Sequence, residues 1–215
     1  MSLLDFLKGR GARRMRVLTC GHPALRRRSE PVGAVTPELR ELAGRLIVTV
    51  FENETAGVGL AAPQVGVNTR LIVLATHDPE QPPEVTASAG ELLLGPRMPL
   101  ALINPEVIWF SAETETRDEG CLSLPEVNGP VERPARVVLR ASTLDGELIQ
   151  VECAGLLGRC IQHEIDHLDG ILFVDRLRDE DRAVVASLVE TLERRTQRRL
   201  GPAEMPASAG GASCG

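Results

Sequence analysis

Two histidines four residues apart could bind a metal ion. They frame the run H-E-I-D-H at residues 163–167, in which Glu164 follows the first histidine. On a helix, residues i and i+4 share a face, so His163 and His167 could reach the same divalent cation. Glu164 could carry a proton in the same site. Because a catalytic ion needs three protein ligands and an open position for water, the sequence predicts a third ligand elsewhere.

Three side chains are candidates for the third ligand. One metalloprotease class continues the motif to a third histidine, but the corresponding position here is Phe173, and no histidine follows the motif. Glu180 or Glu190 could act as in a second class, although both lie in a segment typical of a charged helix. Cys121, within E-G-C-L-S at residues 119–123, offers a thiolate, which is a good ligand for zinc or ferrous iron. We favour Cys121.

A cation held by these three side chains would supply hydrolytic chemistry. Such an ion lowers the pKa of a bound water toward about 7, which gives hydroxide at physiological pH. Hydroxide attacks a carbonyl carbon, while Glu164 takes the proton of the water and later delivers it to the departing amine. The predicted site is therefore that of a metal-dependent hydrolase acting on amides.

Three segments of the chain together resemble the motifs of one enzyme family, the peptide deformylases. They read G-V-G-L-A-A-P-Q at 57–64, E-G-C-L-S at 119–123 and Q-H-E-I-D-H-L-D-G at 162–170. Every fixed position of the family patterns is matched, in the expected order, and the resemblance covers roughly residues 15–200. It implies an enzyme that removes the formyl group from the N-terminal formylmethionine of newly synthesised chains. The helical C-terminal region resembles the family's first type, found in bacteria and organelles.

The resemblance also implies roles for further residues. The side-chain amide of Gln64 and the backbone N–H of Leu122 are expected to stabilise the oxyanion. The backbone at Val58 and Gly59 is expected to bind the peptide as an added strand. The expected cofactor is one divalent ion, Fe²⁺ in the first place, with Zn²⁺, Ni²⁺ or Co²⁺ as substitutes.

The methionine side chain of the substrate is expected to enter an apolar pocket beside the metal. By their helical positions, Leu156, Cys160 and His163 line one wall of that pocket. Cys160 is therefore expected to contact substrate and not the ion.

Composition limits the classes of protein that fit. The 215 residues carry a formal net charge of −6, which argues against a general or sequence-specific nucleic-acid binder. Five cysteines without a regular spacing suit a reducing compartment, and no apolar run is long enough for a membrane helix. We expect a cytoplasmic protein; an organellar protein, with the N-terminus as a transit peptide, is the alternative.

The expected fold is α+β, with small mixed or antiparallel sheets around a central metal-binding helix and a further helix toward each end. Hydrophobic periodicity predicts helices at 37–53, 154–168 and 179–199, the last with Val184, Leu188 and Leu192 spaced by four residues. Five short strands are expected, at 71–74, 101–103, 107–110, 136–140 and 148–151. Asp145-Gly146 predicts a hairpin between the last two. The proline-rich residues 77–98 are expected to form a loop.

The chain is expected to hold one catalytic domain at 15–200, after a flexible extension at 1–14 and before a disordered tail at 201–215. N-formylmethionyl nascent peptides are the expected partners. Arginines gather near the end of the last helix; a solvated face is the default interpretation, and the family resemblance adds a contact with the ribosome as a hypothesis. Two other functions stay open at this stage: a metalloprotease cleaving ordinary peptide bonds, and a non-catalytic ribosome-associated module with a structural metal.

Overall fold

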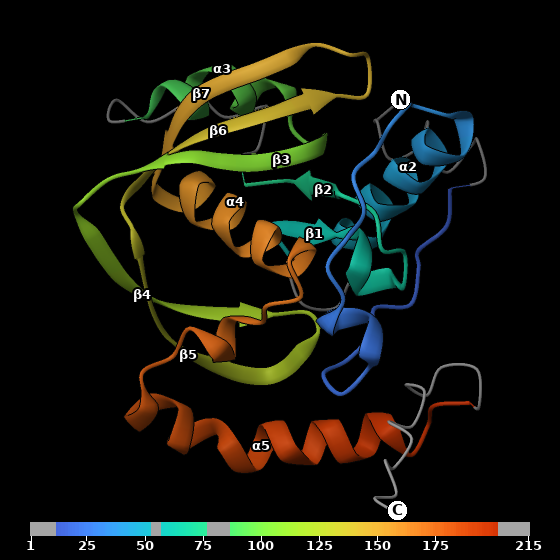
Figure 1. Cartoon of the computed structure of the whole chain (residues 1–215), viewed down its shortest axis with the longest axis vertical. Helices are drawn as coiled ribbons and strands as arrows, with labels where there is room; N and C mark the ends of the chain where they lie inside the picture. Colours follow the sequence, from blue (N-terminus) through green and yellow to red (C-terminus); the bar gives the residue numbers. More distant parts are fainter. Residues whose placement is uncertain (1–11, 53–56, 77–86, 202–215) are drawn as a thin grey trace, which may run out of the picture.

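The structure is a computed structural model that describes residues 12–52, 57–76 and 87–201. Its named strands form two antiparallel sheets, one of five strands and one of two. Helix α4 (Gly155–Leu168), which carries the H-E-x-x-H run, lies between these sheets (Figure 1). The α+β class and the central position of this helix are therefore confirmed.

The five-stranded sheet forms the upper part of the molecule in Figure 1. In spatial order its strands are β1 (Gly59–Ala61), β2 (Leu71–Leu74), β3 (Leu100–Phe110), β6 (Arg136–Thr143) and β7 (Leu148–Ala154). Strands β6 and β7 form the predicted hairpin, in which Gly146 takes a positive φ of 84° that a glycine adopts without strain. Strand β1 lies at one edge of the sheet, so one side of its backbone has no neighbouring strand in the sheet.

The side chains of strand β2 are buried on both faces of the sheet, so each face must be covered. All four of its residues are buried. Leu71 and Val73 belong to the apolar cluster formed with helix α2 (Pro37–Phe51), whereas Ile72 and Leu74 belong to the cluster formed with α4. Because side chains alternate along a strand, the sheet is enclosed by α2 and α4.

Helix α2 begins where the sequence predicted. The hydroxyl of Thr36 accepts a hydrogen bond from the Leu39 N–H, and proline follows the cap as the first helical residue.

The second sheet is a ribbon of two long strands, β4 (Thr114–Cys121) and β5 (Leu124–Pro134). Helix α5 (Asp179–Gln197) packs against β5 on the outer side of this ribbon (Figure 1). The apolar cluster between them includes Val131 of β5, Phe173 of the short helix η4 (Phe173–Asp175) and Val185 of α5. The ribbon thus has a core of its own, separate from that of the larger sheet.

The loop predicted at 77–98 is wrong for its second half. Residues 77–86 lie outside the described residues, but α3 (Ala89–Leu94) and the 3-10 helix η3 (Gly95–Arg97) follow. The Ser88 hydroxyl accepts from the Glu91 N–H, and the Glu91 carboxylate accepts from the Ser88 N–H. This reciprocal capping box is a helix-start signal that the nearby prolines obscured.

Two further predictions need correction. The strands expected at 101–103 and 107–110 are one strand, β3, with a register shift between Ile103 and Glu106. The apolar spacing noted in α5 is only partly that of its packed face: Val184 and Leu188 are 78% and 48% exposed, whereas Leu192 packs on the ribbon together with Val189 and with Val185, which is 7% exposed. Both sets of apolar residues have helical spacing, and only the position of β5 decides which is buried. The predicted extension and tail fall almost wholly outside the described residues.

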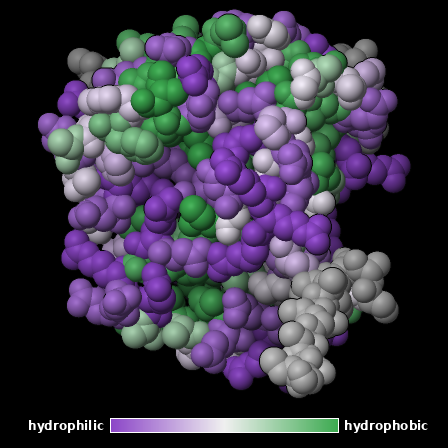
Figure 2. All heavy atoms as spheres, viewed as in Figure 1, coloured by the Kyte–Doolittle hydropathy of each residue, from purple (hydrophilic) through white to green (hydrophobic). Residues whose placement is uncertain are grey.

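The face seen in Figure 2 is largely hydrophilic, and its hydrophobic residues come to the surface in separate patches. Scattered exposed apolar residues are common on folded proteins. No helix within the described ranges is both long and apolar enough to cross a membrane. Two short 3-10 helices, η1 (Pro23–Arg26) and η2 (Ala62–Val65), complete the described elements.

Candidate metal centre

The end of strand β4 and the C-terminal half of helix α4 bring a thiol and two imidazoles together. Cys121 is the last residue of β4, and His163 and His167 lie one turn apart on α4. One ligand atom from each side chain lies within 4.8 Å of the others, and Cys121 Sγ lies 3.2 Å from His167 Nε2. The two imidazole rings are nearly perpendicular, with centroids 4.9 Å apart. The alternative ligands Glu180 and Glu190 are exposed on α5 and belong to no such group in the described part of the chain.

The donor set fits a divalent ion. One sulfur and two ring nitrogens are the ligand types that zinc and ferrous iron accept, and three protein ligands leave a further position for water or substrate. Burial, followed by the nearby His163, lowers the pKa of His167 well below its ordinary value. A neutral imidazole is the form that binds a metal. The residues present are therefore suited to an ion of this kind.

His163 is oriented by a buried carboxylate. Its Nδ1 lies 2.9 Å from Oε2 of Glu119, which is only 6% exposed. Burial alone would raise the pKa of Glu119, but hydrogen bonds from His163 and Arg133 outweigh it and hold the pKa well below the ordinary value. The carboxylate is therefore ionised and suited to accept the Nδ1 proton, so that Nε2 carries the lone pair when the imidazole is in its neutral, metal-binding form.

Glu164 is buried next to the candidate metal ligands Cys121, His163 and His167, which we call the metal cluster. It is 4% exposed, and its Oε2 has no hydrogen-bond partner among the described residues. Burial is the main cause that raises its pKa to about 7. A buried carboxyl group near neutrality can both accept and release a proton at physiological pH.

Strand β1 passes directly over this part of α4. A Cβ added at Gly59 would lie 2.5 Å from Glu164 Oε1 and 2.7 Å from Cys160 Sγ. Only a residue without a side chain allows the backbone of β1 to approach so closely. The Cys160 thiol in turn donates to the Val58 carbonyl oxygen at 3.4 Å. Burial raises the pKa of this thiol, so Cys160 is protonated at neutral pH.

The amide of Gln64 faces the same cluster. Gln64 lies in η2 and is 2% exposed. Its Oε1 accepts from the Ala61 N–H at 2.8 Å, while Nε2 lies 3.4 Å from Cys121 Sγ and 3.2 Å from Ser123 Oγ. Because the oxygen is fixed by the backbone, the N–H groups are directed toward the sulfur.

A cavity of about 690 Å³ opens onto the cluster. It includes all of the residues that the sequence predicted for catalysis, metal binding and substrate binding except His167, which is 1% exposed. Its walls include the residues expected to bind the peptide, Val58, Gly59, Leu156 and Cys160. They also include the expected oxyanion donors Gln64 and Leu122, the expected metal ligands Cys121 and His163, and the expected proton carrier Glu164. Its volume is in the range of ordinary ligand pockets.

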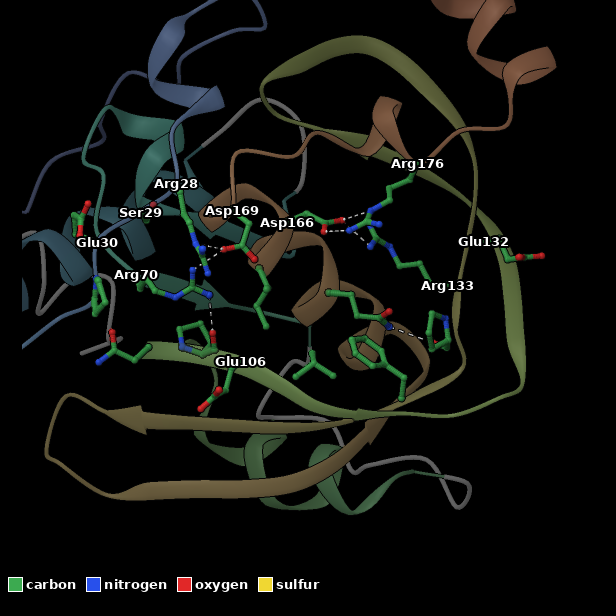
Figure 3. Close-up of a pocket in the computed structure, with 18 residues that line it drawn as sticks. Arg28, Ser29, Glu30, Arg70, Glu106, Glu132, Arg133, Asp166, Asp169 and Arg176 are labelled. Atoms are coloured by element: carbon green, nitrogen blue, oxygen red, sulfur yellow. Dashed lines mark hydrogen bonds and ion pairs between the residues drawn. The ribbon is translucent and has the colours of Figure 1, made fainter.

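A larger cavity, of about 1040 Å³, lies on the other face of α4 (Figure 3). None of the three metal-cluster residues lines it. Its deep wall holds paired charges: Asp166 accepts from Arg133 at 2.8 Å and from Arg176 at 2.6 Å, and Asp169 accepts from Arg70 at 2.7 Å. The volume of a cavity therefore does not identify the candidate active site of this protein. The smaller of the two cavities contains the reactive groups.

Sequence reasoning missed part of the surroundings of the metal cluster. Asp166, inside the H-E-I-D-H run, is 7% exposed and pairs with two arginines and with no histidine. The histidine partner is Glu119. Neither Arg133, which donates to Glu119 from Nε and Nη2, nor Arg159, which donates from Nη1, was singled out. Their contacts span at least fourteen residues of sequence, so no local pattern reveals them.

Comparisons with known proteins agree with the three motifs. The family model described as polypeptide deformylase matches residues 14–183. Peptide deformylase 2 of Gloeobacter violaceus is 44% identical over 172 residues, which are 80% of this chain and 83% of that protein. Peptide deformylase of Phenylobacterium zucineum is 42% identical over 75% of this chain and 86% of its own length.

Solved structures give the same result. The crystal structure of peptide deformylase from Ehrlichia chaffeensis has a TM-score of 0.71 at 31% identity, covering 86% of this chain and 99% of that one. Peptide deformylase 1B of Arabidopsis thaliana, in complex with an inhibitor, has a TM-score of 0.74 at 30% identity, covering 90% and 98%.

Proposed function

The chain belongs to the polypeptide deformylase family, and we propose from this premise which of its residues carry out the reaction. The enzyme is a metal-dependent hydrolase that removes the N-formyl group from newly synthesised polypeptides. In our proposal Cys121, His163 and His167 hold the ion. The observation that supports this most directly is the convergence of these three ligand atoms within 4.8 Å.

We propose ferrous iron as the ion, with Zn²⁺, Ni²⁺ or Co²⁺ as substitutes. One thiolate and two imidazoles suit both iron and zinc. When bound, the ion polarises a carbonyl oxygen and lowers the pKa of water toward about 7.

The proton transfers fall to Glu164. Its carboxylate takes a proton from the attacking water as the new C–O bond forms at the formyl carbon. It then gives that proton to the nitrogen as the C–N bond breaks, so formate and a free amino terminus leave. The burial of Glu164 and its unpartnered Oε2 support this role. The N–H groups of the Gln64 amide and the Leu122 backbone are the proposed donors to the developing oxyanion.

Substrate binding is proposed for the edge of the five-stranded sheet. The backbone at Val58 and Gly59 would pair with an extended peptide, and the edge position of β1 supports this. Leu156 and Cys160 would contact the methionine side chain in the cavity. A formyl group has hydrogen where other acyl groups have carbon, so close walls around the ion favour it over internal peptide bonds.

The third ligand is tested by a matched pair of variants. In Cys121→Ala, we expect metal content and activity on a formyl-Met peptide to fall together to the level of chelator-treated enzyme. A Glu180→Ala/Glu190→Ala double variant should keep both, because these carboxylates are exposed on α5. Metal content is read by elemental analysis after anaerobic purification. Full metal content in Cys121→Ala would overturn the assignment.

A contact with the ribosome is proposed for the C-terminal end of α5. Four exposed arginines gather there, Arg194, Arg195, Arg198 and Arg199. Replacing all four by Gln should weaken co-sedimentation with ribosomes and leave activity on a small formylated peptide unchanged. A control with four exposed arginines elsewhere replaced (Arg97, Arg117, Arg136 and Arg140) removes the same charge. Equal sedimentation of the two variants would reject the contact.

We also propose a cytoplasmic location for the protein. For the organisation of the chain we propose a single catalytic domain at 15–200, an extension at 1–14 and a tail at 201–215.

A further inference from the structure

Arg159 joins three elements around the metal cluster. It lies on α4 one turn before His163, and its side chain is 11% exposed. Its Nη1 donates to Glu119 Oε1 at 2.8 Å and to the Val131 carbonyl at 3.0 Å, and its Nη2 donates to the Glu115 carbonyl at 2.7 Å. One guanidinium thus ties the helix that carries both histidines to both strands of the ribbon that carries Cys121.

Glu119 needs two guanidinium groups because it is buried. Its Oε2 receives His163 Nδ1 and Arg133 Nη2, each at 2.9 Å, and its Oε1 receives Arg133 Nε at 2.6 Å and Arg159 Nη1 at 2.8 Å. A buried charge is stable only when it is paired and fully hydrogen-bonded. Arg133 is shared, since its Nη1 also donates to Asp166.

Arg159 is also part of the wall of the catalytic cavity. Among the described residues that line this cavity it is the one arginine or lysine, and the same wall includes the carboxylates of Asp118, Glu119 and Glu126. Both of its terminal nitrogens are engaged with the protein, so the guanidinium is held in place by groups that the substrate does not supply.

Building on the proposed function, we propose that Arg159 is a positioning residue for the metal centre. It acts through Glu119 on the orientation of His163, and through the carbonyls of Glu115 and Val131 on the placement of the ribbon that presents Cys121. It is not a contact for the substrate. Loss of an outer hydrogen-bond partner of this kind typically costs about 10- to 100-fold in metal affinity or activity.

The test compares Arg159→Met and Arg159→Lys with the wild type and with Arg117→Met. Arg117 is an exposed arginine on β4 that pairs with the Glu115 side chain, and it does not line the cavity. Metal-free protein is titrated with Co²⁺ against a competing chelator. Cobalt absorption reports the thiolate ligand, and kcat and KM are measured on a formyl-Met peptide.

In Arg159→Met we expect the Co²⁺ dissociation constant to rise about tenfold or more and kcat to fall by a similar factor, with KM within about twofold. Arg159→Lys should restore part of the affinity, because it keeps the charge but cannot make all three hydrogen bonds. Arg117→Met should match the wild type. Thermal unfolding of the metal-free variants identifies any loss of affinity that follows from unfolding alone.

Two results would overturn the proposal. A raised KM with unchanged Co²⁺ affinity would make Arg159 a substrate contact, and wild-type values throughout would make it dispensable. If the assignment of Cys121 as a ligand were wrong, the cobalt-loaded wild-type protein would lack the thiolate–cobalt absorption band. A wild-type band together with an unaffected Arg159→Met variant rejects only the role of Arg159.

Discussion

The polar groups of α4 are paired differently on its two faces. At the candidate metal centre, Glu164 Oε2 and His167 Nδ1 are buried without partners among the described residues, although the neighbouring Glu119 carboxylate is fully paired. On the side of the larger cavity, the buried Asp166 carboxylate is bonded by two arginines (Figure 3). An unpaired buried polar group costs stability, while a paired network holds elements together. On α4 itself, the two unpaired groups belong to residues of the candidate metal centre.

This contrast gives a rule for the effects of mutation. Substitutions on the catalytic face should change turnover more than stability, whereas substitutions on the paired face should change stability more than turnover. Enzymes commonly show such a trade-off, because reactive groups are held in settings that do not favour folding.

The largest effect is expected at Glu164. Glu164→Gln keeps the shape of the side chain but cannot carry the proton, so kcat on a formyl-Met peptide should fall by about 10²- to 10⁴-fold. Metal content should be unchanged, and the melting temperature should not decrease. Turnover at the wild-type rate by metal-loaded protein would show that another group moves the proton.

The opposite pattern is expected for Asp166→Ala. Removing one partner of a buried ion pair typically costs about 3–5 kcal/mol of stability, because the remaining charge is left uncompensated. Arg133 keeps Glu119 as a partner, so the lower end of this range is expected, with kcat reduced by about tenfold at most. Urea unfolding and steady-state kinetics on the same preparation separate the two quantities. A large loss of kcat at unchanged stability would contradict the contrast.

Gly59→Ala tests the close approach of β1 to α4. The added Cβ meets Glu164 Oε1 and Cys160 Sγ, so the strand or the carboxylate must shift. A displacement of about 1 Å at a reacting group can cost about 10²-fold in rate. Gly33→Ala is the matched control, since a Cβ there has no neighbour within 4 Å. Equal kcat values for the two variants would mean that β1 yields without disturbing Glu164.

The smallest effect is expected for Arg28→Gln, at the rim of the larger cavity. The Arg28 side chain is 83% exposed, and its Nε lies 3.6 Å from Asp169 Oδ1. Exposed pairs of this kind contribute about 0–1 kcal/mol, and kcat should be unchanged. A clear change in kcat would instead reveal a coupling between the larger cavity and the metal centre.

Sequence patterns predicted the elements that form because of interactions between residues close together in the chain. The apolar spacing located α2, and Asp145-Gly146 located the β6–β7 hairpin. Strands β4 and β5 were missed, because β5 contains prolines at positions 125, 130 and 134, which argue against a strand unless it lies at an edge. In a two-stranded ribbon each strand is an edge strand, so prolines are tolerated. That β5 is an edge strand follows from the fold and cannot be read from the local sequence.

The candidate site was predictable to the same degree. The histidine pair is a local pattern, whereas Cys121 was preferred over Glu180 and Glu190 because a thiolate is a good ligand for zinc or ferrous iron. Arg133 and Arg159 had no signal, since an arginine on an α helix or a strand looks like a solvated residue until its partners are placed. A buried arginine becomes visible only with a structure in which its carboxylate is also buried.

The thiolate and the imidazoles come from parts of the molecule with separate apolar cores. An ion bound as proposed by Cys121 and His167, 46 residues apart, would join the ribbon to the helix. It binds only the assembled form, so it stabilises that form in proportion to the logarithm of its free concentration over its dissociation constant. Metal binding would then oppose the separation of the ribbon from the helix, and protection of the β4 amides from hydrogen exchange would measure this effect.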